Sequence, residues 1–318
     1  MILVTGAAGF VGRHLVQQLI QQEHAVRVLL PLKRYPRLPW PEDPGLEVLD
    51  GSIFSAGGTA PRPAWSAYGV SPGQRPMVGN LRALETIDLA GTRNLLLAAR
   101  AARIGRVITL SHIGAESASG FALLRVKGQV EDAVRRSGLA YTIFRCGVLF
   151  GPEDRFVNNL AMLLHTNPFM AFQPGAAEAL LHPLHIQDLT QALVNSLEAP
   201  DLVDNILEIG GAEYMTYNEM IRTVMRVTGA QRQIIHLPPY ALRALNRATR
   251  RLVPRWPITA QWYDLVAGNR TADLRNLYSY TGVSARRFED TLLTYMPQRR
   301  YALELPRFLL RRRPRPRF

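Results

Sequence analysis

Three glycines follow the first apolar residues of the chain at a spacing that suits phosphate binding. They are Gly6, Gly9 and Gly12 in the stretch TGAAGFVG. Such a tight turn needs a residue that adopts positive φ, and missing side chains let a phosphate approach the backbone. Apolar residues at helical spacing follow, so a helix N-terminus would offer free N–H groups there. The pattern predicts a pyrophosphate-binding turn.

A second candidate for chemistry is Lys127, in the stretch FALLRVKGQVED. It is one of two lysines among 38 basic residues. A compact ammonium can reach ribose hydroxyls that a planar guanidinium fits poorly. The alternative use of its charge is an ion pair with Glu131, one helical turn later. The position that shares its helix face four residues earlier is Leu123, which cannot transfer a proton.

Alternating strands and helices must position these residues. The pattern predicts a helix after the glycine turn, helices over residues 80–103, 186–197 and 217–228 and around Lys127, and strands over residues 1–6, 25–30, 46–51, 106–111, 140–150 and 205–211. Strands that alternate with helices predict an α/β, doubly wound parallel sheet, the Rossmann fold. We expect residues 1–230 to form this core and residues 231–318 to form a small, mostly helical lobe, with residues 151–185 contributing to it. The stretch 51–80 breaks the pattern as an irregular insertion, in which only WSAYGV suits a strand.

The motifs together resemble a known superfamily. TGAAGFVGRHLV, GTRNLLLAAR, RVITLSHIGA, GPEDRFVNNLA and HPLHIQDLTQAL occur in the order typical of the extended and atypical short-chain dehydrogenase/reductases. Within them, the sequence is most similar to the Rossmann-fold accessory subunits of respiratory NADH dehydrogenase (complex I) and their bacterial relatives. The resemblance covers nearly the whole chain. It implies an NAD(P)-binding core that often keeps a bound nucleotide without demonstrable turnover.

The resemblance and the residues together indicate a dinucleotide site. A positive charge after the second strand favours a cofactor with a 2′-phosphate. Since the chain reads PLKR there, NADP(H) is preferred and NAD(H) is the alternative. The acidic residue that relatives place beside the adenine corresponds to Ser52. The expected cofactor-binding residues are Gly6, Ala8, Gly9, Phe10, Val11, Gly12, Lys33, Arg34, Ser52, Ser111, Lys127 and Arg145.

The catalytic pattern of the superfamily is incomplete. Active members carry a tyrosine four residues before the lysine, where this chain has Leu123. Lys127, Ser111 and His112 remain as catalytic candidates, and a histidine can transfer protons near neutral pH. His182 and His185 lie three residues apart, but no further ligand completes a metal set, so no metal is expected.

The positive charge gathers at the carboxyl end. The chain has a net charge of +13, and residues 231–318 carry 18 basic and 5 acidic residues. Residues 237–257 predict an amphipathic basic helix, and the tail LRRRPRPRF predicts an extended arm. An acidic protein surface or anionic lipid fits this charge, and nucleic acid is not expected because no binding motif is present.

Three functions follow from these patterns. The first is an NADP(H)-binding, non-catalytic accessory or assembly subunit of a complex I-like membrane assembly, docked by its basic end on the cytoplasmic face. The second is an NAD(P)H-dependent reductase or epimerase with an unusual proton donor, and the third is a scaffold whose nucleotide site is empty. The apolar strand at the start, without a basic leader, and the lone Cys146 favour a cytoplasmic location.

Overall fold

The computed structural model describes residues 1–30, 38–51, 68–71, 85–166, 169–175, 178–253 and 256–310. Its centre is a seven-stranded parallel sheet in the order β11–β6–β5–β4–β1–β2–β3. The strands are β1 (Ile2–Thr5), β2 (Val26–Leu30), β3 (Leu46–Asp50), β4 (Tyr68–Ser71), β5 (Arg106–His112), β6 (Ala140–Cys146) and β11 (Asn205–Ile209). The strand order reverses between β1 and β4, as in a doubly wound sheet. The predicted Rossmann fold is therefore confirmed.

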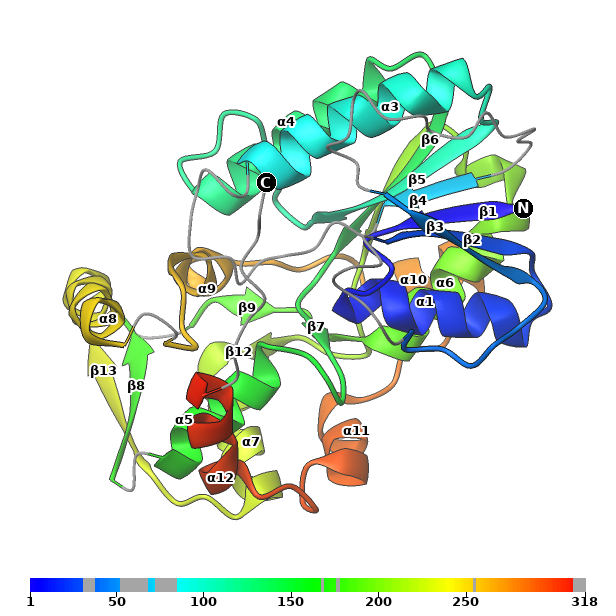
Figure 1. Cartoon of the computed structure of the whole chain (residues 1–318). Coiled ribbons are helices and arrows are strands. Elements are labelled where there is room, and N and C mark those ends of the chain that lie inside the picture. Colours follow the sequence, from blue (N-terminus) through cyan, green and yellow to red (C-terminus); the bar gives the residue numbers. More distant parts are fainter. Residues whose placement is uncertain are drawn as a thin grey trace.

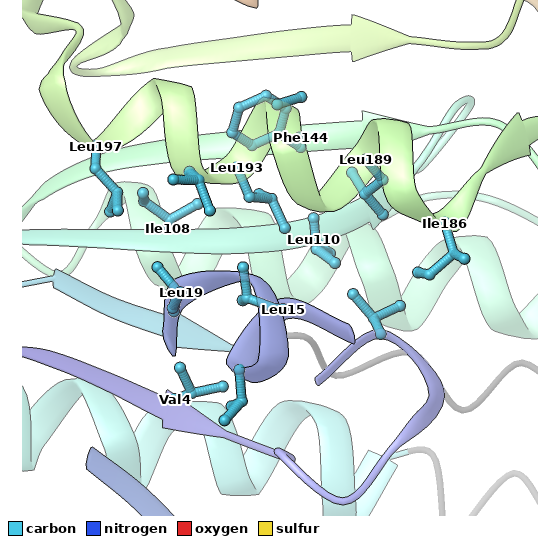
Figure 2. Close-up of a cluster of buried hydrophobic side chains, with 14 of the residues drawn as sticks. Val4, Leu15, Leu19, Ile108, Leu110, Phe144, Ile186, Leu189, Leu193 and Leu197 are labelled. Carbon is cyan, nitrogen blue, oxygen red and sulfur yellow. The ribbon is translucent and has the colours of Figure 1, made fainter. Parts of the chain in front are cut away.

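Helices cover both faces of this sheet. The helices α1 (Phe10–Gln21) and α6 (Ile186–Asn195) pack against each other on one face, and α3 (Gly91–Ala101) and α4 (Ala122–Arg135) cover the other (Figure 1). Apolar side chains from β1, β5, β6, α1 and α6 meet between the layers (Figure 2). This burial stabilises the sheet and fixes the carboxyl end of β1, where the glycine turn begins.

The predicted strand over residues 140–150 is wrong in its second half. β6 ends at Cys146, and β7 (Leu149–Phe150) pairs with β10 (Leu184–His185) outside the large sheet. The chain leaves the sheet at Gly147, where an added Cβ would lie 1.9 Å from the carbonyl oxygen of His182. The close approach of the two backbones therefore requires a glycine at that position and ends the strand.

Beside the Rossmann core lies a lobe with its own cluster of buried apolar side chains. It contains α5 (Val157–Thr166), α7 (Tyr217–Thr228), α9 (Ala260–Val266), α11 (Phe288–Tyr295) and α12 (Tyr301–Leu310). Two small sheets accompany them: β8 (Met170–Pro174) with β13 (Gln233–Leu237), and β9 (Leu180–Leu181) with β12 (Met215–Thr216). The helix α8 (Pro239–Leu252) contacts β8 at the margin of the molecule (Figure 1).

Packing does not divide the chain at a single residue. The helices α5 and α7 precede residue 231 but pack in the lobe cluster. Conversely, α10 (Asn276–Thr281) follows residue 231 and packs on the Rossmann cluster through Leu277. The described residues also contain a π-helix (Glu85–Ala90) before α3 and two 3₁₀ turns, Ser196–Glu198 and Pro200–Leu202. No helix in the described ranges is both long and apolar enough to span a bilayer.

Candidate nucleotide site

The glycine turn has the geometry that its sequence predicts. Gly6 follows β1 with φ of 65°, and its carbonyl oxygen accepts the N–H of Gly9 at 2.8 Å. A Cβ on Gly12 would lie 2.4 Å from the oxygen of Gly6 and 2.6 Å from the Cα of Ala7. The first turn of α1 therefore rests directly on the loop, and any side chain at position 12 would push the two apart.

The N-terminus of α1 suits an anion. Its N-cap is Gly9, which has no side chain to accept the first N–H groups of the helix, and the first turn carries no acidic residue. Val11 is buried in the core and Phe10 stacks edge-on against His14, so both would contribute backbone N–H groups rather than side chains. These groups and the positive end of the helix dipole fit a pyrophosphate.

Three predicted cofactor residues lie outside the described residues. They are Lys33 and Arg34, which follow β2 along the chain, and Ser52, which follows β3. The same applies to most of the insertion 51–80, of which the structure describes residue 51 and β4. The preference for a 2′-phosphate therefore rests on the sequence.

Lys127 has a partner that the sequence did not suggest. Its Nζ lies 3.0 Å from Oδ2 of Asp88, and the two side chains are 3% and 4% exposed. Asp88 lies in the π-helix before α3, which packs against α4. Glu131, the alternative partner for Lys127, binds another cation. A buried ammonium without a counter-charge would be costly, so Asp88 stabilises Lys127 in place.

Arg145 is that other cation. It forms a bidentate pair with Glu131 (Nη2 to Oε2, 2.7 Å; Nε to Oε1, 3.0 Å) and a single bond with Glu208 at 3.1 Å. It also donates to the carbonyl oxygen of Ala115 at 3.1 Å. These bonds raise the pKa of the guanidinium further and join α4, β6 and β11. The structure thus gives Arg145 a role inside the fold, and its expected contact with a cofactor stays a prediction.

Leu123, the residue at the tyrosine position, lies in an apolar environment. It is 1% exposed and belongs to the lobe cluster together with Phe156 and Trp262. The indole of Trp262 stacks on Phe156 and donates to Oη of Tyr217 at 3.1 Å. The N–H of Leu123, in the first turn of α4, is bound by the carboxylate of Asp264 on α9. The lobe therefore packs against the point from which a catalytic hydroxyl would act.

Ser111, His112 and Cys146 lie at the carboxyl ends of β5 and β6, and all three are buried. Burial, with the nearby charges of Lys127 and Arg270, lowers the pKa of His112 to about 3. Burial raises the pKa of the Cys146 thiol. At neutral pH both side chains are uncharged, and His112 is too weak a base to accept a proton readily.

His182 and His185 have structural partners. Nε2 of His182 lies 2.8 Å from the carbonyl oxygen of Gly211, and its Nδ1 accepts the N–H of Ala272. His185 accepts from Arg286 at 3.1 Å and packs against the ring of Phe150. Within the described ranges, no three His, Cys, Asp or Glu side chains are grouped to hold a metal ion.

Arg270, which comes from the lobe, could not be predicted from the sequence. Its guanidinium lies over the ring of Phe121 at 5.9 Å, and an added Cβ on Gly114 would lie 3.2 Å from its Nη1. It thus covers the loop between β5 and α4 and adds positive charge near His112. Only the folded chain brings position 270 to this loop, so no local motif could have revealed it.

The geometry of β1, the turn and α1 agrees with a comparison to protein families. Residues 6–160 match the family model described as NAD(P)H-binding. This match, over just under half of the chain, agrees with its Rossmann fold. The match covers the glycine turn, Lys127 and the strands from β2 to β7.

Curated relatives of this chain have diverse roles. A ceramide reductase from Caulobacter vibrioides is 28% identical over 242 residues, which cover 75% of this chain and 74% of the relative. The photosystem II assembly factor Ycf39 of Synechocystis is 22% identical over 303 residues, 93% of this chain and 90% of the relative. The mitochondrial NADH dehydrogenase [ubiquinone] 1 alpha subcomplex subunit 9 of Arabidopsis thaliana is 26% identical over 247 residues, 74% of this chain and 60% of that subunit.

Solved structures agree on the fold. A nucleoside-diphosphate-sugar epimerase from Staphylococcus aureus superposes with a TM-score of 0.72 at 15% identity, over 92% of this chain and 99% of the epimerase. At such low identity the likeness shows the fold alone. It extends beyond the Rossmann core, so the lobe also has a counterpart in these enzymes.

Proposed function

We propose that this protein is an NADP(H)-binding, non-catalytic accessory or assembly protein of a membrane-associated electron-transfer complex. The observation that carries the proposal is Leu123, which replaces a catalytic tyrosine and is buried among apolar residues of the lobe. The intact glycine turn supports retention of nucleotide binding, whereas the leucine supports loss of proton transfer.

Two groups of relatives support an accessory role. One is named as an assembly factor of photosystem II and the other as a subunit of NADH dehydrogenase. Both names associate a relative of this chain with a large electron-transfer assembly. The charge of this chain agrees with docking, because residues 231–318 carry 18 basic and 5 acidic residues. We therefore assign docking to this basic region, at the cytoplasmic face of a membrane.

The proposed nucleotide contacts begin at the glycine turn. Backbone N–H groups between Ala8 and Gly12 would bind the pyrophosphate, and Lys33 and Arg34 would favour the 2′-phosphate of NADP(H). Ser111 and Lys127 lie at the carboxyl edge of the sheet, where the nicotinamide ribose would bind. Asp88 would orient Lys127 there.

The experiment is to purify the protein, extract any nucleotide and identify it, and then titrate NADPH and NADH by fluorescence. We expect bound or titratable NADPH, weaker binding of NADH, and no NADPH oxidation with carbonyl or quinone acceptors. Absence of both bound and titratable nucleotide would reject the proposal and favour a scaffold with an empty site.

A second candidate function is an NAD(P)H-dependent reductase, since a relative is named ceramide reductase. It would need a proton donor other than a tyrosine at position 123. His112 is poorly suited, because its pKa near 3 leaves it neutral and weakly basic. Steady NADPH oxidation with a carbonyl substrate, abolished in Lys127→Met, would establish this function instead.

Docking has its own test. Deletion of residues 311–318 removes five arginines from the end of the chain. We expect the shortened protein to be lost from the membrane fraction and from its complex in cell extracts. Unchanged co-sedimentation would count against docking through the tail. It would not contradict the proposal that the protein binds nucleotide.

A further inference from the structure

The helix α8 is an unusual part of the lobe because most of it faces solvent. Of the described side chains in this 14-residue helix, only Leu242 and Asn246 are buried. They lie four residues apart and therefore on one face, which packs on the lobe. Figure 1 shows α8 at the margin of the molecule, on the far side of the lobe from α1 and the large sheet.

The solvent-facing surface of α8 is divided into two strips. At 100° per residue, Ala244, Leu245, Ala248 and Leu252 form one strip, and Arg243, Arg247 and Arg251 form the next. All seven residues are exposed, and Leu252 is 82% exposed. No acidic residue occurs between positions 239 and 252. An apolar strip beside a basic strip, both unburied, is the pattern of a helix that lies in a membrane interface.

The neighbouring strand adds exposed apolar side chains to this edge. Met170 and Phe172 point to solvent from β8, alternating with the buried Ala171 and Gln173. Phe169, just before the strand, is 72% exposed, and Tyr240 at the start of α8 is 77% exposed. Since α8 contacts β8, these residues belong to one region of the lobe. We name α8 and residues 169–172 the α8 edge.

We propose that the α8 edge binds the surface of an anionic lipid bilayer, with leucine and aromatic side chains entering the interface and arginines facing the headgroups. The inference deepens the proposed docking at a membrane, on which it rests, by assigning the lipid itself as a partner. Two observations favour lipid over an acidic protein. The arginines run from position 243 to position 251, over about 12 Å of the helix, without an acidic residue between them. The exposed apolar side chains belong to elements at the margin of the molecule (Figure 1), where a planar interface can reach them without a complementary groove.

The experiment uses the full chain and vesicles of phosphatidylcholine, with or without phosphatidylglycerol, in flotation assays at low and high salt. We expect binding only with phosphatidylglycerol and weaker binding at high salt. Each arginine near an anionic surface contributes about 1 kcal/mol, so Arg243→Gln/Arg247→Gln/Arg251→Gln should weaken binding by roughly 100-fold. Leu245→Ser/Leu252→Ser should also weaken binding, at both salt concentrations.

The matched control is Arg93→Gln/Arg100→Gln/Arg136→Gln, which removes the same charge from exposed positions on α3 and next to α4. The lipid inference is overturned if the wild type does not bind, if it binds both vesicles equally, or if the control loses as much affinity. It is also overturned if deletion of residues 311–318 abolishes binding and the α8 variants do not weaken it. Circular dichroism and melting curves verify that every variant is folded.

The two proposals can fail separately. If the wild type binds anionic vesicles and is never recovered with a membrane complex, the lipid inference holds and the accessory role fails. If vesicles are not bound but the α8 arginines are needed for recovery with a complex, an acidic protein surface is the partner. That result would overturn the lipid inference and leave the accessory role intact.

Discussion

Lys127 and Asp88 form an ion pair of 3.0 Å that is almost completely buried. The lysine comes from α4 and the aspartate from the π-helix before α3, so the pair joins the two helices that cover one face of the sheet. The positive charge of Lys127 contributes to the low pKa of His112. The lysine therefore belongs to a polar cluster inside the protein, and its partner in this cluster is a carboxylate in place of a tyrosine.

Breaking this ion pair should destabilise the protein strongly. Lys127→Met would leave the charge of Asp88 buried without its partner. Asp88→Asn would likewise leave the charge of Lys127 buried without its partner. Removing one partner of a buried pair costs about 3–5 kcal/mol. The double variant Asp88→Asn/Lys127→Met removes both charges, so its free energy of unfolding in urea should be higher than that of either single variant. Losses that simply add in the double variant would show that the two residues do not stabilise each other.

The glycine turn gives a second prediction, for both stability and nucleotide binding. Gly12→Ala would place a methyl group 2.4 Å from the carbonyl oxygen of Gly6, so α1 must move away from the loop. We expect a lower melting temperature and loss of NADPH binding in a fluorescence titration. Gly105→Ala is the matched control, because an added Cβ there meets no atom within 4 Å. If Gly12→Ala binds NADPH as the wild type does, the turn is not the pyrophosphate site.

The parts of the fold that could be predicted are those fixed by neighbouring residues. The bounds of α7 match the sequence prediction because both ends carry local signals. Thr216 and Glu219 form a capping box, and Gly229 ends the helix with φ of 73°. The turn over the seven residues from Gly6 to Gly12 is likewise determined locally, because its glycine positions have no room for side chains.

The parts that could not be predicted depend on contacts between distant segments. Asp88 and Lys127 are 39 positions apart, and the alternative partner Glu131 is nearer in sequence. The parallel pair of β8 and β13 joins residues about 60 positions apart, and each strand is only five residues long. Arg270 reaches Phe121 only after the lobe has folded onto α4. Local periodicity carries no information about such pairings.

The stability of the protein should depend on His112 at acidic pH. Its pKa is about 3 in the folded state and about 6.5 when unfolded. Between these values the unfolded state binds more protons, so the free energy of unfolding falls as the pH falls. For one such group the loss between pH 7 and pH 5 is about 2 kcal/mol. Urea unfolding at several pH values should therefore show a flatter dependence for His112→Gln than for the wild type.

The comparison between the two proteins is needed because other groups titrate in the same range. Burial also lowers the pKa of His185, to about 4, which adds to the loss of stability in acid. Burial raises the pKa of Asp154 to about 6, so this group works in the opposite direction below pH 6. Both contributions cancel in the difference between His112→Gln and the wild type. Equal slopes for the two proteins would mean that the pKa of His112 is the same in the folded and unfolded states.

The last prediction concerns the missing tyrosine. Leu123→Tyr restores the residue type that active relatives carry, four residues before Lys127, but we expect no NADPH oxidation with carbonyl substrates. The new ring must fit among Phe156, Trp262 and other packed side chains, at a cost of about 1–3 kcal/mol. Lys127 remains bound to Asp88, so its charge is shared with a carboxylate. Leu123→Phe is the control for ring size without the hydroxyl. Turnover in Leu123→Tyr that is absent from Leu123→Phe would show that the substitution at position 123 alone had removed the enzymatic activity.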